Sequence, residues 1–460
     1  MNSSTSTVRL NPASSSFMVG LLNDGLNAVD PATAVARHLT LEQGRVLRAT
    51  GGWEVDLSQV SRVVVIGAGK GTAPMAQAVE QLLGQRIDRG RIVVKDGHGL
   101  PLQWIHTDES SHPVPDARGE IAAKSLAHTL MGLDAADLVI ALWSGGASAL
   151  LPAPREGLSL ADKQATTRLL LASGVPIHEV NAVRKHLSWL KGGQLARLAQ
   201  PARVLCLAVS DVLGDDLGTI GSGPFFPDTT RFADVADIIQ RAGLTERLPS
   251  AVQQLLQRGI HGQEAETPFP GDPCFDRVHH VVVASNGQAV AAMAARAQAE
   301  GWAVECGAAP LEGEAADAGR AFAQRARDLA RSGRPTVLIA GGETTVTLGD
   351  HPGLGGRNQE FALAAAEVLA RTAEAPGELP VQILAAGTDG NDGPTTAAGA
   401  VVDAGTWGRA LASGWDPRRH LLGHDAHPLL DHVGALLVTG PTRTNVMDVA
   451  VAVVGGPGVR

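Results

Sequence analysis

The sequence contains no tyrosine and few other aromatic residues, with 7 Trp and 8 Phe among its 460 residues. Proteins that hold single-stranded nucleic acid stack its bases on aromatic side chains, so this shortage argues against that class. Basic residues are also outnumbered, with 38 Lys and Arg against 47 Asp and Glu. The resulting net charge of -9 offers no general attraction to nucleic acid or to an anionic membrane surface. We therefore expect a small-molecule substrate.

Cysteines are few, and long apolar runs are missing. Cys206, Cys274 and Cys306 lie far apart and form no CxxC pair, which excludes a disulfide framework and a cysteine zinc site. No apolar run reaches the ~18 residues that a membrane helix requires, and the Ser/Thr-rich start of the chain lacks the apolar core of a signal peptide. These features predict a cytoplasmic protein that binds no membrane.

Short β-branched runs recur in the first half of the chain, each followed by a glycine-rich turn and an Ala/Leu-rich stretch. They cover residues 62–66, 91–94, 138–143 and 204–209. Continuous apolar strands of this kind are buried on both faces, as in parallel sheets that helices cover on both sides. The pattern predicts an α/β fold.

A second series of such runs predicts a second sheet. Its strands are expected at residues 278–284, 302–306, 336–340 and 381–385, with helices at 287–300 and 315–331. The segment HGQEAETPFPGDPCFDR between the two series is polar, contains three prolines and has no periodicity, which is typical of a linker. We predict an N-terminal domain over residues 15–260, a linker over 261–277 and a C-terminal domain over 278–460.

The first candidate site is the glycine turn of RVVVIGAGKGTAPMAQAVE, where Gly67, Gly69 and Gly71 surround Lys70. Glycines let the backbone approach an anion, and the N-terminus of the following helix offers free N–H groups. The lysine ammonium would then lie over the same anionic group. An ordinary tight turn between a strand and a helix, with the lysine in solvent, is the alternative.

A second glycine turn lies in DLVIALWSGGASALLPAP. Its small residues, whose amides and hydroxyls suit a phosphate or carboxylate, are Ser144, Gly145, Gly146 and Ser148. The turn lacks the GxSxG pattern of a nucleophile elbow, which argues against a serine hydrolase.

The segment EVNAVRKHLSWLKGGQLARL predicts a helix that ends at Gly192 and Gly193. At about 100° per residue, one of its faces carries the polar residues Asn181, Arg184, Ser188 and Lys191. Exposed helices are commonly supported by Glu–Lys pairs, which this face lacks. It is therefore either a solvated basic face or a set of donors for an anion.

Two aspartates follow predicted strands, and both lie in glycine-rich loops. Asp211 follows the strand in VLCLAVSDVLGDDLGTIGSGP, and Asp389 lies in LAAGTDGNDGPTTAAGA. Carboxylates at such positions suit Mg²⁺ or general-base chemistry. Ordinary turn formation by Asp and Gly is the alternative.

The segment GLGGRNQEFALAAAEVL places Arg357 and Asn358 in the first turn of a helix, directly after Gly356. A guanidinium at this position offers two parallel donors to a carboxylate or phosphate. We therefore add Gly356, Arg357 and Asn358 to the candidate anion-binding residues.

Together with the closing TGPTRTNVMDV, these motifs resemble the glycerate 2-kinases of the MOFRL type, which are often labelled hydroxypyruvate reductases. The similarity runs from about residue 15 to 455. It implies two Rossmann-like α/β domains with the active site in the cleft between them. It also implies ATP-dependent phosphorylation of the 2-hydroxyl of D-glycerate to 2-phosphoglycerate, with Mg²⁺ or another divalent cation. The segment HDAHPLL departs from the pattern expected for the family.

The resemblance further implies roles for single residues. In the family, the lysine of the GAGK turn and the arginine of GGRNQE are regarded as active-site residues, and they correspond to Lys70 and Arg357. We predict that these cations, one from each domain, hold the carboxylate of glycerate and the γ-phosphate when the domains close. Asp211 or Asp389 would hold Mg²⁺ or accept the 2-hydroxyl proton, and the sequence does not decide which.

Two other functions stay open. The first is an NAD(P)H-dependent hydroxypyruvate reductase, because the GAGKG turn approaches the GxGxxG pattern and Asp96 could bind a ribose, although Thr72 replaces the third glycine. The second is a sensor that binds a sugar phosphate without turnover. The sequence does not fix the number of subunits, and a homodimer stays among the options.

Overall fold

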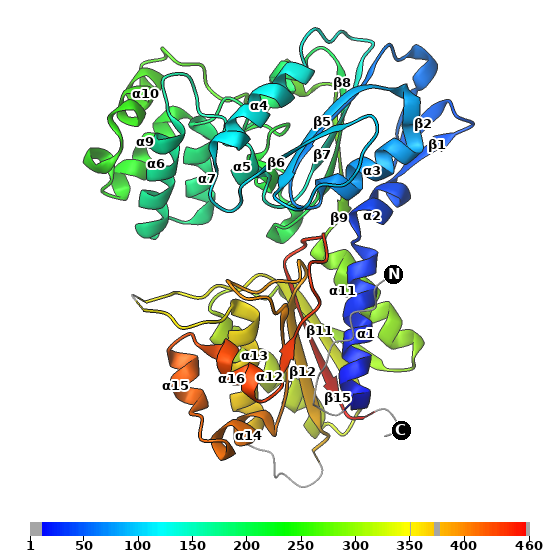
Figure 1. The fold of residues 1–460 in the computed structure, drawn as a ribbon, viewed down its shortest axis with the longest axis vertical. Coiled ribbons are helices and arrows are strands. Elements are labelled where there is room, and N and C mark those ends of the chain that lie inside the picture. Colours follow the sequence, from blue (N-terminus) through cyan, green and yellow to red (C-terminus); the bar gives the residue numbers. More distant parts are fainter. Residues whose placement is uncertain (1–11, 350, 372–377, 457–460) are drawn as a thin grey trace. The chain divides into compact units, whose positions relative to one another are not determined.

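The computed structural model describes residues 12–349, 351–371 and 378–456. The described chain divides into two compact units (Figure 1). Residues 31–284 form one unit, which we call the central unit, and residues 12–30 together with those from 285 onward form the other, which we call the terminal unit. No described helix is long and apolar enough to span a membrane.

The central unit contains strands and helices in alternation. Its strands are β1 (Leu39–Glu42), β2 (Val46–Ala49), β3 (Trp53–Asp56), β4 (Val63–Ala68), β5 (Ile87–Lys95), β6 (His106–Ser110), β7 (Leu138–Trp143), β8 (Arg203–Val209) and β9 (Val278–Ala284). Its helices are α2 (Pro31–His38), α3 (Thr72–Leu83), α4 (Ala117–Thr129), α5 (Ala147–Leu150), α6 (Leu160–Ala172), α7 (Ile177–His186), α8 (Gln194–Ala199), α9 (Phe232–Arg241) and α10 (Ser250–Ile260).

The main sheet of the central unit has the strand order β6-β5-β4-β7-β8-β9, and every neighbouring pair is parallel. Counted along the chain, this is the 3-2-1-4-5-6 order of the Rossmann fold. The order reverses between β4 and β7, and ligands of such folds bind outside the carboxyl ends of the strands at this reversal. A separate antiparallel sheet contains β1, β2 and β3.

The division between the units differs from the sequence-based boundary at 261–277. Strand β9, which was expected to begin the second sheet, pairs instead in parallel with β8. The segment before it also packs on the central unit: Thr267 donates to the Asp228 carboxylate at 3.1 Å, and Cys274 lies in the core beside α8 and β8. The polar composition of this segment therefore reflects hydrogen bonding across the surface of the central unit rather than a free linker.

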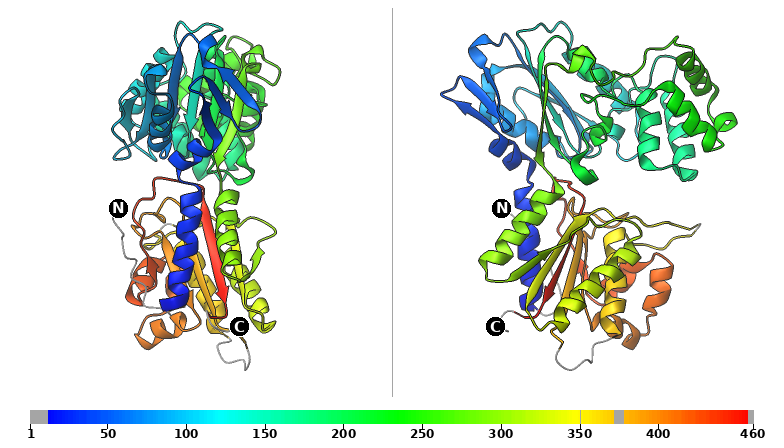
Figure 2. Two further views of the ribbon diagram at one scale, coloured as in Figure 1. Left: turned by 90° about the vertical axis from the view of Figure 1, so that its right-hand side faces the viewer. Right: turned by 180° about the vertical axis from the view of Figure 1, so that it is seen from behind.

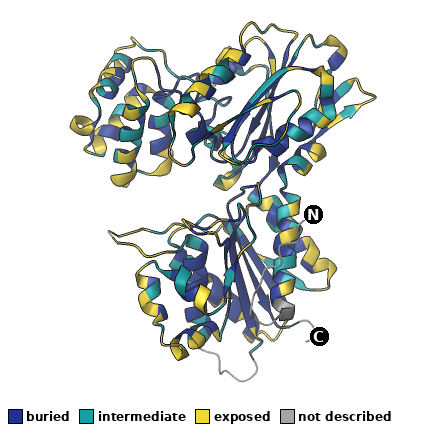
Figure 3. Cartoon of the chain, viewed as in Figure 1, coloured by how far each residue is buried: buried dark blue, intermediate teal, exposed yellow. Residues whose placement is uncertain are grey.

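The apolar runs of the central unit are buried on both faces. All residues of β4 and β7 are buried, and Figure 3 shows dark blue strands in the middle of the unit. Val64, Ile66 and Ala68 face a core that includes residues of α4, α5 and α8. Helices α6, α7, α9 and α10 share a separate apolar cluster around Phe232.

The terminal unit begins with α1 (Pro12–Ala28), which is far from the rest of the unit in sequence. The later helices are α11 (Asn286–Ala299), α12 (Ala315–Arg331), α13 (Arg357–Ala370), α14 (Thr406–Ala412), α15 (Pro417–Leu422) and α16 (Ala426–His432). The strands are β10 (Ala303–Cys306), β11 (Thr336–Gly342), β12 (Val381–Gly387), β13 (Gly399–Asp403), β14 (Leu436–Leu437) and β15 (Asp448–Val454).

The sheet of the terminal unit is mixed, with the order β10-β11-β15-β12-β13-β14. Strand β15 lies antiparallel between β11 and β12, so these two strands run in the same direction. The first residue of β15, Asp448, therefore lies beside the carboxyl ends of β11 and β12, opposite Gly342 and Gly387.

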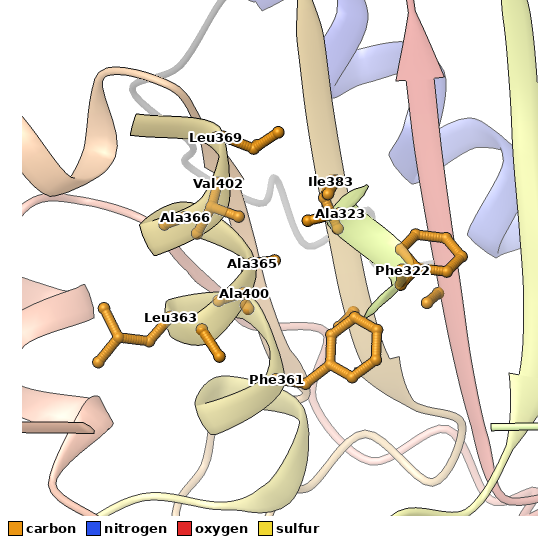
Figure 4. Packing of buried hydrophobic residues seen from close by; sticks show 14 of the residues in the cluster. Phe322, Ala323, Phe361, Leu363, Ala365, Ala366, Leu369, Ile383, Ala400 and Val402 are labelled. Atoms are coloured by element: carbon orange, nitrogen blue, oxygen red, sulfur yellow. The ribbon is translucent and has the colours of Figure 1, made fainter. Parts of the chain in front are cut away.

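Helices cover both faces of this sheet, as Figure 2 shows for α1 and α11 on one side. Val337 and Ile339 of β11 pack in the same cluster as α1 and α11. Their neighbours Leu338 and Ala340 pack in the cluster of α12 and α13, which includes Phe361 (Figure 4). This alternation follows from the two-residue side-chain repeat of a strand. The predicted α/β class, with two α/β units, is thus confirmed.

Candidate active site

Two glycine turns follow β4 and β7, the neighbouring strands at which the order of the central sheet reverses. The turns are tied to each other, because the Lys70 amide donates to the Gly145 carbonyl at 2.9 Å and the Gly71 amide donates to Ser144 Oγ at 3.0 Å. Gly69 has a φ of 140°, and a Cβ there would overlap the backbone of Ser144. The turn after β4 therefore requires glycine at this position.

The amides of the first turn are not open to an anion. Gly69 donates to the Val93 carbonyl at 3.1 Å, and the amides of Lys70 and Gly71 are occupied as described. Gly67 belongs to β4 itself, where it allows close packing against Leu142 of β7. In the second turn, by contrast, the amides of Gly145 and Gly146 donate no hydrogen bond to another described residue.

Lys70 is half-buried beside the second turn. A Cβ built on Gly146 would lie 3.4 Å from Lys70 Cγ and 3.0 Å from the His112 ring, so both side chains lie against this glycine. His98 contacts the Lys70 carbonyl through Nδ1 at 3.0 Å. Sequence reasoning assigned no role to either histidine, because neither shows metal-ligand spacing with a second histidine.

Two of the predicted cationic side chains bind Ser148 of α5. Its hydroxyl accepts from Arg184 Nη2 at 2.7 Å and from Lys191 Nζ at 2.7 Å, and its carbonyl accepts from Lys191 Nζ at 2.6 Å. Asn181 is buried beside them, and its side-chain oxygen Oδ1 lies 3.4 Å from Arg184 Nη1. The structure thus brings together Ser148, Asn181, Arg184 and Lys191.

The predicted helix over these residues is too long. Helix α7 ends at His186, so Ser188 and Lys191 do not continue its face. The residues after the helix pair instead with the loop after α5. The backbone amide of Arg155 donates to the Leu187 carbonyl, and the backbone amide of Trp189 donates to the Ala153 carbonyl. Lys191 reaches Ser148 from a loop rather than from a helix.

Lys163 of α6 joins this group and was missed from the sequence, where it appears as one lysine of a polar helix. Its ammonium donates to the Pro152 carbonyl, and its side chain is buried. Burial lowers the pKa of Lys163 to about 7, and the Arg184 charge acts in the same direction. Burial, followed by the charges of Lys163 and Arg184, lowers the pKa of Lys191 well below its usual value.

The loop after β8 carries Asp211 and packs onto the same site. Ser222 in this loop lies 2.9 Å from the Ser148 hydroxyl, measured between the two Oγ atoms. Asp211 is half-buried and lies two residues after the end of β8. Asp216, a further acid of this loop, accepts from the Gly218 amide and the Thr219 hydroxyl, so its carboxylate stabilises the turn.

In the terminal unit, Arg357 is the first residue of α13 and is held by carboxylates. Its Nε and Nη2 donate to Asp448 at 2.6 and 3.1 Å, and its Nη1 lies 2.7 Å from Glu343. The two guanidinium donors that were predicted to bind a substrate anion therefore already bind Asp448. Burial opposes the charge of Arg357, but the pairing with Asp448 raises its pKa. Burial raises the pKa of Asp448 to about 6, against the effect of Arg357.

Asp392 caps the N-terminus of α13. Its carboxylate accepts from the backbone amides of Asn358 and Gln359 at 3.0 and 2.9 Å, and from both side-chain amides. Gly356 lies so close to Asp392 that a Cβ would overlap it. Gly356 and Asn358, both predicted to bind an anion, are thus occupied in holding the start of the helix.

Asp389 is half-buried after β12, with Oδ1 accepting from the Asn391 amide at 3.0 Å. Across the described residues, no group of three or more His, Cys, Asp or Glu side chains is arranged to hold a metal ion.

All three cysteines are free, and burial raises the pKa of both Cys206 and Cys274.

Comparison with known proteins places these features in a class. The chain matches the family described as "Domain of unknown function (DUF4147)" over residues 17–257 and the MOFRL family over residues 336–448. It therefore combines a Rossmann-ordered unit that carries buried cations with a MOFRL unit.

The relatives are more specific. The chain is 38% identical to a protein of Pyrococcus horikoshii named glycerate 2-kinase, over 94% of this chain and 96% of that protein. It is 41% identical to an Agrobacterium vitis protein named putative hydroxypyruvate reductase, over 86% of this chain and all of that protein. The crystal structure of glycerate kinase from Thermotoga maritima matches with a TM-score of 0.81 at 34% identity, over 95% of this chain and 99% of that one. The chain belongs to the family of the MOFRL-type glycerate 2-kinases.

Proposed function

We propose that the protein transfers the γ-phosphoryl group of ATP to the 2-hydroxyl of D-glycerate and so forms 2-phosphoglycerate. The observation that carries the proposal is a cluster of cationic side chains that follows β7 at the reversal of the Rossmann-ordered sheet, with Arg184 and Lys191 bonded to Ser148 and Lys163 bonded to the Pro152 carbonyl. Both reactants are anions. Kinship with proteins named glycerate 2-kinase supports the same reaction.

Phosphoryl transfer depends mainly on positioning the reactants and on neutralising the charge spread over the transferred group. We assign Lys70, beside the unoccupied amides of Gly145 and Gly146, to an anionic oxygen of the phosphoryl donor. Arg357 is assigned to the same reaction. Its Nη1 pairs with Glu343, whose side chain is 40% exposed, so this contact is the one that a substrate anion can replace.

The donor chemistry fits a magnesium–nucleotide complex. Mg²⁺ is usually bound through one or two carboxylates together with substrate phosphates and water, so a cluster of three acidic side chains is not required. Asp211 and Asp389 each supply a carboxylate two residues after the end of a strand. We propose that Asp211 or Asp389 would hold Mg²⁺, which when bound neutralises charge on the phosphate oxygens. The other aspartate would accept the proton of the 2-hydroxyl.

A reductase activity is disfavoured by the contacts of Asp96. In dinucleotide-binding folds, an acid near this position binds the ribose hydroxyls. Here both carboxylate oxygens of Asp96 accept from Arg118, at 2.7 and 2.8 Å, and this pairing lowers the pKa of Asp96. Thr72, in place of the third glycine, is buried and bonded to Ser144.

The deciding experiment compares two reactions of the purified protein. ADP release with D-glycerate and ATP is measured beside loss of NADH absorbance with hydroxypyruvate, and phosphorus NMR identifies the product. We expect ADP release and 2-phosphoglycerate. Formation of 3-phosphoglycerate would contradict the regiochemistry, and NADH oxidation without ADP release would replace the kinase with the reductase.

We further propose that the protein acts in the cytoplasm and binds neither nucleic acid nor membrane. Light scattering would decide whether it forms a homodimer.

A further inference from the structure

Three segments of the central unit contact Ser148, and a fourth brings Lys163 to the carbonyl of nearby Pro152. Arg184 comes from the end of α7, Lys191 from the loop after it, Lys163 from α6 and Ser222 from the loop after β8. The Ser148 oxygen accepts from both Arg184 and Lys191, so its two lone pairs are used. Its own proton is then directed to Ser222 Oγ at 2.9 Å.

The positive charge of this cluster is not balanced by the protein. Among the described residues, no carboxylate lies within 4.0 Å of the charged nitrogens of Lys163, Arg184 or Lys191. Asp228, which lies beside Gly192 on the neighbouring loop, is engaged elsewhere, since Lys185 Nζ lies 3.5 Å from its carboxylate. Within the described part of the chain, the hydrogen bonds of these three side chains all go to uncharged oxygen atoms.

Burial makes this imbalance costly. Lys163 is 7% exposed and Lys191 is 3% exposed, and a buried charge without an opposite charge is strongly destabilising. Arg184 and Ser148 are half-buried, so the cluster is accessible from their side. An anionic group that enters there would contact the guanidinium first and would supply the missing negative charge.

We infer that Lys163, Arg184 and Lys191 form the binding site for the carboxylate group of the hydroxy-acid substrate. The identity of this substrate rests on the proposed function. A carboxylate is favoured over the phosphates of the nucleotide because those phosphates carry Mg²⁺, and the Arg184 guanidinium, together with any protonated lysine of the site, would repel that metal ion. The site leaves Lys70 and Arg357 for the phosphoryl group.

Binding at this site draws in protons. At pH 8 the Lys163 side chain, with its pKa near 7, is mostly the neutral amine, and the lowered pKa of Lys191 likewise favours the neutral form of that lysine. The groups that act on these two lysines are each other and Arg184, all of them cationic. A bound carboxylate raises the pKa of both lysines. We expect the uptake of about one proton per carboxylate at pH 8 and less at pH 6, and an affinity that falls up to about tenfold per pH unit above about 7.

Proton uptake can be measured directly on the unmodified protein. Unbuffered protein at pH 8 is titrated with sodium D-glycerate adjusted to the same pH, without nucleotide, and the acid needed to hold the pH is recorded in a pH-stat. The uncharged methyl ester of glycerate and inorganic phosphate serve as comparison ligands. We expect uptake with glycerate and none with the ester. Binding of glycerate without proton uptake would overturn the inference, and so would uptake with phosphate alone.

Variants assign the effect to the cluster. Lys163→Met and Lys191→Met are each expected to weaken glycerate binding at least about tenfold and to reduce the proton uptake. Lys124→Met is the control, because Lys124 is exposed and pairs with Glu120 at 3.0 Å. Circular dichroism establishes that each variant is folded. Unchanged KM for glycerate in both cluster variants would refute the site.

The measurements separate this inference from the proposed function. Glycerate binding with proton uptake but without ADP release would leave the carboxylate site standing and remove the kinase. Normal turnover, with KM and proton uptake unaffected by Lys163→Met and Lys191→Met, would leave the kinase and remove the site.

Discussion

Lys163 makes a specific prediction about the pH dependence of stability. Its pKa is about 7 in the folded protein against a reference value of 10.5, so between these values the unfolded chain binds more protons than the folded one. The free energy of unfolding therefore rises with pH across this window and is lowest below pH 7. Integration between pH 7 and pH 9 gives a gain of about 2 kcal/mol from this single group.

The substitution Lys163→Met removes that contribution and retains an apolar stem of similar length. Urea unfolding at pH 7 and pH 9 should show that the wild-type protein gains about 2 kcal/mol relative to the variant on going to the higher pH. Saturating D-glycerate should reduce this gain, because the ligand restores the charge. Lys124→Met should follow the wild type at both pH values. A difference between wild type and Lys163→Met that does not change with pH would refute the reasoning.

Three further predictions concern the catalytic residues and the turn that carries Lys70. Lys70→Ala and Arg357→Ala should each lower kcat/KM by at least ~10² in the coupled ATP assay, because each removes a charge from the phosphoryl transfer; near-normal turnover in both would contradict their assignment. Asp448 gains a proton as the pH falls through about 6, which weakens its pairing with Arg357, so kcat should fall below this pH and Asp448→Asn should remove that acid limb. Gly69→Ala should lower the thermal unfolding temperature by several degrees, since its φ of 140° excludes a side chain and its Cβ would overlap Ser144; an unchanged melting curve would show that the turn can adjust.

The sequence was sufficient for four strands of the central sheet, β4, β5, β7 and β8, because residues such as Val63–Ala68 and Leu138–Trp143 are continuously apolar and end at glycine turns. It did not predict β6, whose residues are polar and mostly not buried. It was not sufficient for the place of Val278–Ala284. That strand follows a polar segment in sequence, and its partner β8 is decided by backbone pairing. Neither local composition nor periodicity records such pairing.

The candidate site was predicted only in part, because residue types can be read from the sequence but burial and backbone pairing cannot. Ser148, Arg184 and Lys191 were selected from their residue types, and the structure brings them together, although the helix expected to align them ends at His186. Lys163 was missed because a single lysine in a polar helix gives no signal of burial. The amides around Lys70 were expected to be open, but their partners, such as the Val93 carbonyl, lie on neighbouring strands.

Asp448 illustrates a further limit. It lies within the closing motif that carried the family resemblance, yet its residue type alone gives no role. Its position at the first residue of an antiparallel strand inserted between β11 and β12 brings it to Arg357. Only the strand order makes that contact predictable.

The path of the chain through its two units has a practical consequence for dissecting the protein. Residues 31–284 are one uninterrupted stretch, so a fragment with these ends retains every strand of the Rossmann-ordered sheet. A fragment that begins at Ser285 would lack α1, and the apolar surface that Met18, Leu21 and Leu22 cover on the other sheet would face water. Fusing residues 12–30 directly ahead of residue 285 would restore that cover. The central unit can therefore be expressed as one continuous fragment, whereas the terminal unit requires this fusion.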